Sequence, residues 1–454
     1  MLRYSLILST ALVVTACAGT PPLATAPQLD LPAGFASAPD APGPQEPDWV
    51  SALGDDALPG LVAEAMMTNP NLAAARANLE AALASARAAG APRLPSADAT
   101  TSGTVRDIAV GSPEVYSAGI EITWQADVWG RIADGARAGA LSAEASAADL
   151  AGAQLSVAAT IANSWFAFTE ARLQRELAER DAGTRTRQLE IVERRFVRGV
   201  SRSSDVRTAR SALASSQAAL AVRQRTEANA ARALQTALGR YPDGTLAAAD
   251  TLPDLRDLPA PGTPEALISR RPDIIAAERR LAAAGYSAEA ARKALYPTLN
   301  LRGVVSGQAA SPSDVFSSAN LVESLTASIT APIFRGGSLR AERDRAAAAA
   351  RAQAARYVET SLTALREVEN ALQSDGFLAQ RVAAQQTALE EAAAALELVE
   401  RQYAQGVGTI FELIDAQTRL TQAESQLISA RRERIDNRVA LHLAIAGPFA
   451  AAAE

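Results

Sequence analysis

Hydrophobic and polar residues alternate with a period of two in two segments of about ten residues each. Apolar side chains fall on one face of each segment and polar side chains on the other. The apolar positions are Ala118, Ile120, Ile122, Trp124 and Ala126 in the first segment, and Leu325, Ala327, Ile329, Ala331 and Ile333 in the second. A weaker alternating segment precedes each one, at residues 97–104 and 298–307. This pattern is typical of barrel strands with one face in lipid and one in water. Two hairpins on a soluble sheet would give the same alternation.

The two long stretches without proline, residues 114–241 and 333–447, predict long helices. Both are rich in alanine and dotted with charges, and each is interrupted once by glycine, at residues 199–201 and 406–408. We therefore expect each stretch to form a helical hairpin. A helix over residues 131–198 would be roughly 100 Å long at 1.5 Å per residue. It can bury its apolar stripe only in a bundle or a coiled coil.

The chain contains a tandem repeat. Residues 193–196 and 199–200 recur 207 residues later, at 400–403 and 406–407. Nearer the start of each repeat the offset is 202 residues, as between Pro95 and Pro297. The repeat predicts two structural halves, each with helices, two strands and a long hairpin. The first half is expected at 49–255, with strands at about 96–104 and 115–126, and the second at 256–454, with strands at about 298–307 and 321–333.

The first sixteen residues have the pattern of a bacterial secretion signal. A charged start, Met1-Leu2-Arg3, precedes an apolar run that ends at Val14-Thr15-Ala16-Cys17. This ending resembles a lipobox, in which the cysteine is lipidated and becomes the first residue after cleavage. Because Cys17 is the only cysteine in the chain, we expect a covalent lipid there rather than an ordinary signal with an incidental cysteine. Residues 17–48, rich in proline, alanine and glycine, are expected to form the lipidated tether.

Composition excludes several classes of function. Alanine accounts for 106 of the 454 residues and aromatic residues for only 4%, which favours closely packed long helices over a bulky globular core. The net charge of −6 leaves no basic surplus for nucleic-acid binding. With one cysteine and one histidine, His442, the chain has no set of catalytic, metal-binding or cofactor-binding residues of the usual kinds. We therefore expect no enzymatic activity and no cofactor beyond the lipid, and we expect His442 to lie at the surface or in helix packing.

Four strands cannot close a barrel, and lipid does not tolerate an open sheet edge. If the strands span a membrane, the protein must therefore assemble from several copies.

The chain also contains five sequence blocks that resemble those of the TolC-like outer-membrane efflux family, in its lipoprotein branch with the NodT/OprM-type members. The resemblance covers about residues 49–449. The blocks are Arg271-Pro272-Asp273-Ile274 through Tyr296-Pro297, Asp127-Val128-Trp129-Gly130-Arg131, Pro332-Ile333-Phe334-Arg335-Gly336-Gly337, and the two segments that begin at Gly199-Val200 and Gly406-Val407.

The resemblance implies a mainly α fold with a small β part. Long helices are expected to form a periplasmic α-barrel, and four strands per chain to contribute to a shared transmembrane β-barrel in a homotrimer. Such a protein is a passive, gated exit duct for drugs or other small molecules. It lies in the outer membrane, anchored by lipid, and extends into the periplasm to meet a periplasmic adaptor and an inner-membrane pump of the RND type. The alternatives are an outer-membrane component of type I protein secretion and a periplasmic coiled-coil lipoprotein without a pore.

The same resemblance assigns roles to residues near the two glycine turns. Glu412 and Asp415, three residues apart on one helix face, match the acids of the pore constriction, although such a pair is often only a solvated helix face. Asp205 and Tyr403 match residues of a gate latch. The arginine that completes the latch in some members is absent near Gly408, which leaves Arg202 or Arg207 as substitutes. The expected adaptor contacts are Gly199, Val200, Gly406 and Val407, where glycine is also needed simply to end a helix.

Overall fold

The computed structural model describes residues 26–38, 48–105 and 114–447. These residues fall into two compact units. One contains residues 26–29, 78–105, 114–148 and 273–360, and the other contains residues 30–38, 48–77, 149–272 and 361–447. Each unit takes residues from both of the predicted sequence halves, so the halves 49–255 and 256–454 do not correspond to the compact units. The shorter helices come before the strands that begin each repeat. They are α2 (Trp49–Ala52), α3 (Leu58–Thr68) and α4 (Pro70–Gly90) before β1, and α7 (Pro264–Arg270) and α8 (Pro272–Lys293) before β3.

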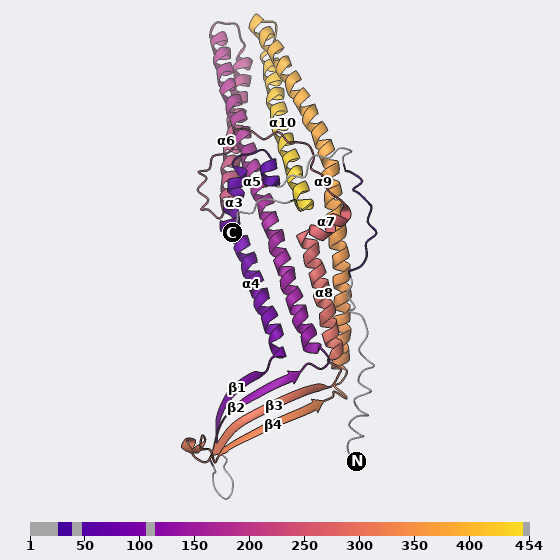
Figure 1. Cartoon of the computed structure of the whole chain (residues 1–454). Helices are drawn as coiled ribbons and strands as arrows, with labels where there is room; N and C mark the ends of the chain where they lie inside the picture. Colours follow the sequence, from indigo (N-terminus) through magenta and orange to yellow (C-terminus); the bar gives the residue numbers. More distant parts are fainter. Residues whose placement is uncertain (1–25, 39–47, 106–113, 448–454) are drawn as a thin grey trace. The chain divides into compact units, whose positions relative to one another are not determined.

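The first unit contains one antiparallel sheet in which the four strands lie in chain order (Figure 1). The strands are β1 (Ser96–Val105), β2 (Glu114–Ala126), β3 (Thr298–Ala309) and β4 (Leu321–Thr330). β4 ends three residues before the expected position 333. Its last residue, Thr330, pairs with the first residue of β3, Thr298, so residues 331–333 have no strand beside them within the chain. Pro332 also lacks the N–H that a ladder needs.

The strand register places the predicted apolar positions on one face of the sheet. Ile120 lies opposite both Ala99 and Val305, and Leu301 lies opposite Ala327. The other face is polar. On this face Arg302 forms a bidentate ion pair with Glu121, in which Nε and Nη2 of Arg302 lie 2.5 Å and 2.8 Å from the two carboxylate oxygens. Large apolar side chains on the apolar face are exposed within one chain, as Leu325 at 83% and Ile329 at 74% illustrate.

Two long helical hairpins, predicted from the proline-free stretches, follow the two strand pairs (Figure 1). The first is made of α5 (Arg131–Val197) and α6 (Ser203–Ala237), and the second of α9 (Ser338–Gln405) and α10 (Ile410–Ala444). Alanine and arginine-rich sequences with few β-branched residues favour such lengths. In the part of the chain that the structure describes, no helix is both long enough and apolar enough to cross a membrane.

The main core of the second unit lies where α2 and α3 pack against the long helices. Trp49, Phe166 and Leu234 are fully buried there. Alanines of α5, among them Ala158 and Ala162, are equally buried and allow neighbouring helices to approach closely. Each fully buried side chain of the larger kind stabilises the fold by about 1.5–3 kcal/mol. This cluster gathers the few bulky residues of an aromatic-poor chain into one place.

Candidate functional site: the two hairpin tips

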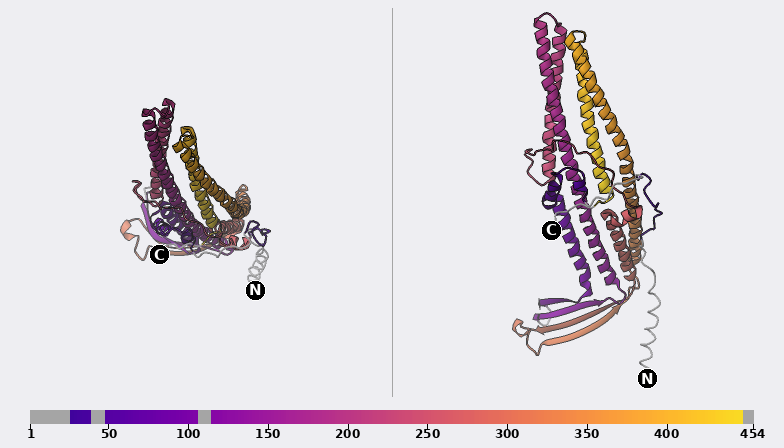
Figure 2. Two further views of the ribbon diagram at one scale, coloured as in Figure 1. Left: turned by 90° about the horizontal axis from the view of Figure 1, so that it is seen from above. Right: turned by 45° about the horizontal axis from the view of Figure 1, so that its top comes forward.

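The turns of both hairpins have the same backbone geometry and lie side by side (Figure 2). Gly199 and Gly406 both adopt left-handed backbone angles, with φ of 75° and 84°. The N–H of Val200 bonds to the carbonyl oxygen of Arg195 at 2.9 Å, and the N–H of Val407 to that of Gln402 at 3.0 Å. This six-to-one bond with a left-handed glycine is a Schellman ending, which satisfies carbonyls that the helix leaves free.

The turns also present apolar side chains to solvent. Val200 is 65% exposed and Val407 is 75% exposed. An exposed valine next to a rigid turn offers a small apolar contact at the same place on both hairpins. All four residues predicted to contact the adaptor are therefore accessible. The helix endings alone also explain why glycine stands at positions 199 and 406, even if no adaptor binds there.

Asp205 and Glu412 are held by the backbone of their own helices. Asp205 Oδ2 accepts the N–H of Arg202 at 2.9 Å, and Glu412 Oε2 accepts the N–H of Thr409 at 2.7 Å. Glu412 Oε2 also accepts the Thr409 hydroxyl at 3.0 Å, while its own N–H donates to that hydroxyl oxygen. The bond from the Thr409 backbone, followed by the bond from its hydroxyl, lowers the pKa of the Glu412 carboxyl. Glu412 is therefore a charged helix cap.

Asp415 has a different environment from Glu412, although the two lie on the same helix face. Its carboxylate is 2.8 Å from Nε of Arg419, one turn further along α10, and 62% of the Asp415 side chain is exposed. An exposed pair of this kind contributes little to stability. Asp415 is thus the more available of the two acids predicted for the pore constriction.

Tyr403 and Asp205 are the two residues predicted for the latch, and each contacts another residue: Asp205 contacts Arg202, and Tyr403 contacts Arg195. The guanidinium of Arg195 lies over the Tyr403 ring, 4.7 Å from its centroid, and Arg195 Nη1 donates to the Tyr403 carbonyl oxygen at 3.3 Å. Arg195 belongs to the first hairpin and Tyr403 to the second. Sequence reasoning missed Arg195 because a contact between hairpins leaves no local spacing signal.

The two tips carry opposite net charges, which sequence reasoning also missed. The 21 residues 190–210 contain six arginines and three acids, for a net charge of +3. The equivalent 21 residues 397–417 contain one arginine and four acids, for a net charge of −3. A charge count of the two repeated segments would have found this difference, because the tips match at an offset of 207 residues. Charges of opposite sign at neighbouring tips attract one another over roughly a Debye length, about 8–10 Å in physiological salt.

A row of polar contacts joins the first hairpin to the second along α5 and α10. Ser425 Oγ bonds to Gln174 Oε1 at 2.8 Å, and Ser429 Oγ bonds to Glu170 Oε1 at 2.7 Å. Nearer the tips, Arg185 Nη2 donates to Thr418 Oγ1 at 3.0 Å. The spacing of three and four residues among Thr418, Thr421, Ser425 and Ser429 places these residues on one face of α10, but it does not reveal their partners on α5. Because the row is polar, water can replace its contacts at lower cost than those of an apolar seam.

Other predicted residues have simpler outcomes. Cys17 and the expected signal peptide lie outside the described residues. Trp124 donates its indole N–H to the carbonyl oxygen of Arg93 at 3.1 Å, and Trp129 to that of Pro297 at 2.6 Å. His442 is buried against Trp49, with ring centroids 5.6 Å apart, so packing rather than surface exposure describes it. Within the described ranges, histidine, cysteine and acidic side chains form no group of three that could hold a metal ion.

Comparisons with known proteins give consistent matches along the chain. The family model described as outer membrane efflux protein matches residues 61–240 and 263–447. The pyoverdine export outer membrane protein OpmQ of Pseudomonas aeruginosa is 31% identical over 461 residues, covering 97% of this chain and 96% of OpmQ. The cation efflux system protein CusC of Escherichia coli is 26% identical over 409 residues, covering 89% of each chain. The solved structure of the outer-membrane channel OprN superposes with a TM-score of 0.84 at 28% identity, covering 93% of this chain and 99% of that one.

Proposed function

Because the chain belongs to the outer membrane efflux protein family, we propose that it is the passive, gated exit duct of a tripartite system that exports small molecules. As a family member it is an outer-membrane efflux channel with a TolC-like fold. The finer parts of the proposal are the trimer, the gate, the adaptor and the pump. No chemical step is assigned to the chain, and the pump supplies the energy of transport.

The observation that carries the proposal is the sheet with one apolar face, one polar face and two free edges. An apolar face of this kind is stable against lipid, while the polar face with its Glu121–Arg302 pair suits a water-filled lumen. Because lipid does not tolerate unpaired strand edges, several sheets must join. Three copies with four strands each would make a barrel of twelve strands, large enough for an aqueous channel.

The hairpin tips form the proposed gate and docking surface. Asp415 of each copy contributes to a ring of carboxylates at the constriction, which attracts cations. Glu412 holds the start of α10 in place beside this ring. The basic first tip and the acidic second tip attract each other around the ring of hairpins and favour the closed state. Arg202 and Arg207, at the start of the first hairpin's α6, then replace the latch arginine that is absent near Gly408 of the second hairpin.

The adaptor is proposed to contact the turns through Gly199, Val200, Gly406 and Val407. Two features support this surface: the exposed valines and the identical turn geometry of both hairpins. An inner-membrane pump of the RND type is the proposed source of substrate. The named functions of two relatives, pyoverdine export and cation efflux, favour small molecules over proteins as cargo.

A lipid on Cys17 is proposed to anchor the mature chain in the outer membrane. The lipobox-like sequence Val14-Thr15-Ala16-Cys17 supports it. The test is incorporation of labelled palmitate into the wild type and into Cys17→Ser. We expect label in the wild type only, and label in the variant would place the lipid elsewhere.

Deletion of the gene tests the export function directly. The deletion strain should become more sensitive to a panel of drugs and dyes and should accumulate more of at least one of them, and the wild-type gene on a plasmid should reverse both effects. An unchanged panel together with loss of a secreted protein from the medium would instead identify a protein-secretion component.

A further inference from the structure

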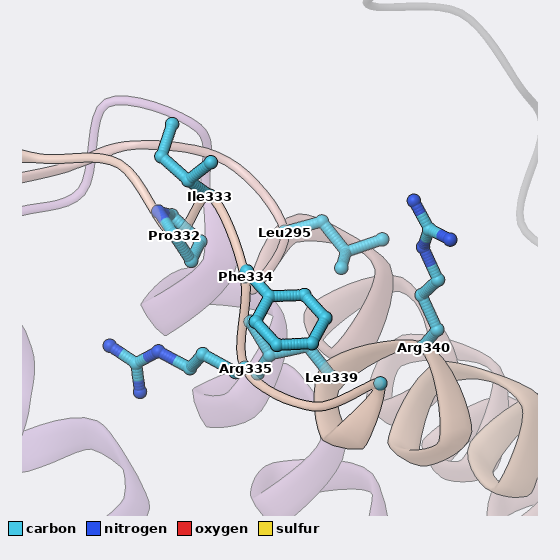
Figure 3. Close-up of a pocket in the computed structure, with 8 residues that line it drawn as sticks. Leu295, Pro332, Ile333, Phe334, Arg335, Leu339 and Arg340 are labelled. Carbon is cyan, nitrogen blue, oxygen red and sulfur yellow. The ribbon is translucent and has the colours of Figure 1, made fainter.

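Exposed apolar and basic side chains lie next to one another where β4 leads into α9. Ile333 is 93% exposed and Phe334 is 86% exposed, and Arg335 and Arg340 are exposed beside them. All four residues line a pocket of about 340 Å³, in which the two arginines lie on opposite sides of the Phe334 ring (Figure 3). We call these four residues the junction patch.

The two guanidinium groups of the junction patch have no hydrogen bond or ion pair with any residue that the structure describes. The next two arginines of α9 do have partners. Arg343 Nη2 lies 2.7 Å from the carboxylate of Asp344, and Arg345 is paired with Glu342. The arginines nearest the sheet are therefore the ones without a counter-charge.

Other acidic side chains at this end of the sheet are already engaged. Asp127 accepts two backbone N–H groups at the start of α5, at 3.0 Å and 2.7 Å. Asp134 lies 2.5 Å from Nζ of Lys293. Arg93, which precedes β1 at the other edge of the sheet, is exposed as well. This end of the sheet therefore carries positive charge that the acids beside it do not balance.

The equivalent junction of the first repeat, between β2 and α5, satisfies its side chains within the chain. Trp129 packs edge-on against Tyr296, with ring centroids 5.5 Å apart, and donates its indole N–H to the carbonyl oxygen of Pro297. Arg131 Nη2 donates to Oε1 of Gln125 at 2.9 Å. A strand can thus lead into a long helix without exposed aromatic and basic side chains. Their exposure at the second junction indicates a partner outside the chain.

The apolar row of β4 leads directly into the junction patch. Apolar residues occupy alternate positions from Leu325 to Ile333, and the next position of this row is Arg335. A membrane has the same order along its normal, from acyl chains to charged headgroups. An arginine at such a boundary keeps its aliphatic stem in the apolar region and its guanidinium among the headgroups.

We propose that the junction patch binds anionic phospholipid in the periplasm-facing leaflet of the outer membrane. Ile333 and Phe334 contact acyl chains, and Arg335 and Arg340 each pair with a headgroup phosphate. This inference rests on the proposed function, in which the apolar face of the sheet lies in lipid. Phosphate accepts two parallel N–H bonds from a guanidinium and supplies the missing counter-charge. A second copy fits less well, because Arg93 at its other edge would add positive charge.

Retention of lipid by the full-length protein tests the proposal. The protein is reconstituted in bilayers of equal parts phosphatidylglycerol and phosphatidylcholine and extracted in mild detergent, and the lipids that remain bound are counted by mass spectrometry. The test variant is Arg335→Gln with Arg340→Gln. The matched control is Arg343→Gln with Arg345→Gln, which removes the same charge further along α9 from arginines that already have partners.

We expect the wild type to retain more phosphatidylglycerol than phosphatidylcholine. The ratio of the two should be about fivefold higher than in the test variant, because a basic residue near an anionic surface gives a preference of about that size. The control should keep the wild-type ratio. A second measurement needs no variant: raising salt from about 0.1 M to about 1 M should lower the wild-type ratio, since salt screens the attraction.

Two results would overturn the lipid site: equal ratios in the wild type and the test variant, or a wild type without preference for phosphatidylglycerol. An unchanged ratio together with dissociation of the variant's oligomers in pure phosphatidylcholine would place the arginines at a contact between copies instead. In each of these cases a wild type that still conducts ions leaves the duct intact. If the wild type neither inserts into bilayers nor conducts, the duct and the lipid site fail together.

Discussion

Asp205 and Glu412, which lie 207 residues apart, make the same contact at the two hairpin tips. Each is the third residue of its helix and accepts the backbone N–H three residues earlier, at 2.9 Å for Asp205 and 2.7 Å for Glu412. A carboxylate in this position offsets both an unpaired donor and the positive end of the helix dipole. Both acids, predicted for a latch and for a pore ring, therefore have a structural task in every protomer.

Removing either cap should loosen its tip. We expect Asp205→Ala and Glu412→Ala each to lower the local stability of its tip, because the backbone N–H at the start of the helix loses its carboxylate acceptor. Hydrogen exchange of peptides over residues 200–210 and 407–417 measures this loss. Glu412→Gln is the matched control, because glutamine keeps the acceptor of the capping box and loses only the charge. Equal exchange in Glu412→Ala and the wild type would show that the cap does not hold the tip.

Charge selectivity should depend on Asp415 more than on Glu412. The Asp415 carboxylate is exposed and pairs with Arg419, whereas the backbone of Thr409 holds the Glu412 carboxylate. Asp415→Asn should therefore reduce the preference for potassium over chloride, measured as the reversal potential in a KCl gradient across a planar bilayer. Glu412→Gln should have a smaller effect. The reverse order of the two effects would remove Asp415 from the constriction.

The opposite charges of the tips should make closure sensitive to salt. Between 0.1 M and 1 M salt the Debye length falls from about 10 Å to about 3 Å. Conductance should then rise by more than the bulk conductivity of the solution. Replacing Arg202 and Arg207 together by glutamate should raise conductance already at low salt. Arg225→Glu, an exposed substitution further along α6, serves as the control. A double variant that conducts like this control would contradict attraction between the tips.

Acid should destabilise the second unit through His442. Burial, followed by the positive charge of Arg438, lowers the pKa of His442 from 6.5 to about 4. His442 therefore takes up a proton below pH 6.5 in the unfolded chain, but only below about pH 4 in the folded chain. The stability from the neutral ring is complete above pH 6.5 and decreases as the pH falls towards 4, by up to about 3 kcal/mol.

The comparison that isolates this effect is His442→Phe, which keeps an aromatic ring against Trp49 and cannot titrate. Thermal unfolding in detergent from pH 7 to pH 4 should fall less steeply for this variant than for the wild type. Parallel curves for the two proteins would mean that another group controls the acid response.

The sequence was sufficient for the strands and the hairpins, because both follow from local rules. Alternation from Ala118 to Ala126 specifies a two-faced strand, and the absence of proline around Gly199 and Gly406 specifies two long hairpins. The cap at Glu412 was also readable, since Thr409 and Glu412 have the spacing of a capping box. The end of β4 could not be predicted from the sequence. β4 ends at Thr330 because its partner strand β3 begins at Thr298, and no strand of the described chain continues beside residues 331–333.

Contacts between distant segments were beyond the sequence. The stacking of Arg195 on Tyr403 joins the two hairpins, and the bond of Ser425 to Gln174 joins α10 to α5. On a helix such arginine, serine and glutamine side chains resemble a solvated face, and only the packing of the hairpins shows that they meet. The two compact units mix both sequence halves for the same reason: strand pairing and helix packing act across the repeat boundary.

Single-channel recording of the purified wild-type protein in planar lipid bilayers is the direct test of an ion-conducting duct through the outer membrane. We expect discrete, long-lived conductance steps from folded oligomers, and larger steps from the double variant Arg202→Glu with Arg207→Glu. Folded, oligomeric protein that gives no conductance in either form would show that the protein is not a duct, and would favour a coiled-coil lipoprotein without a pore.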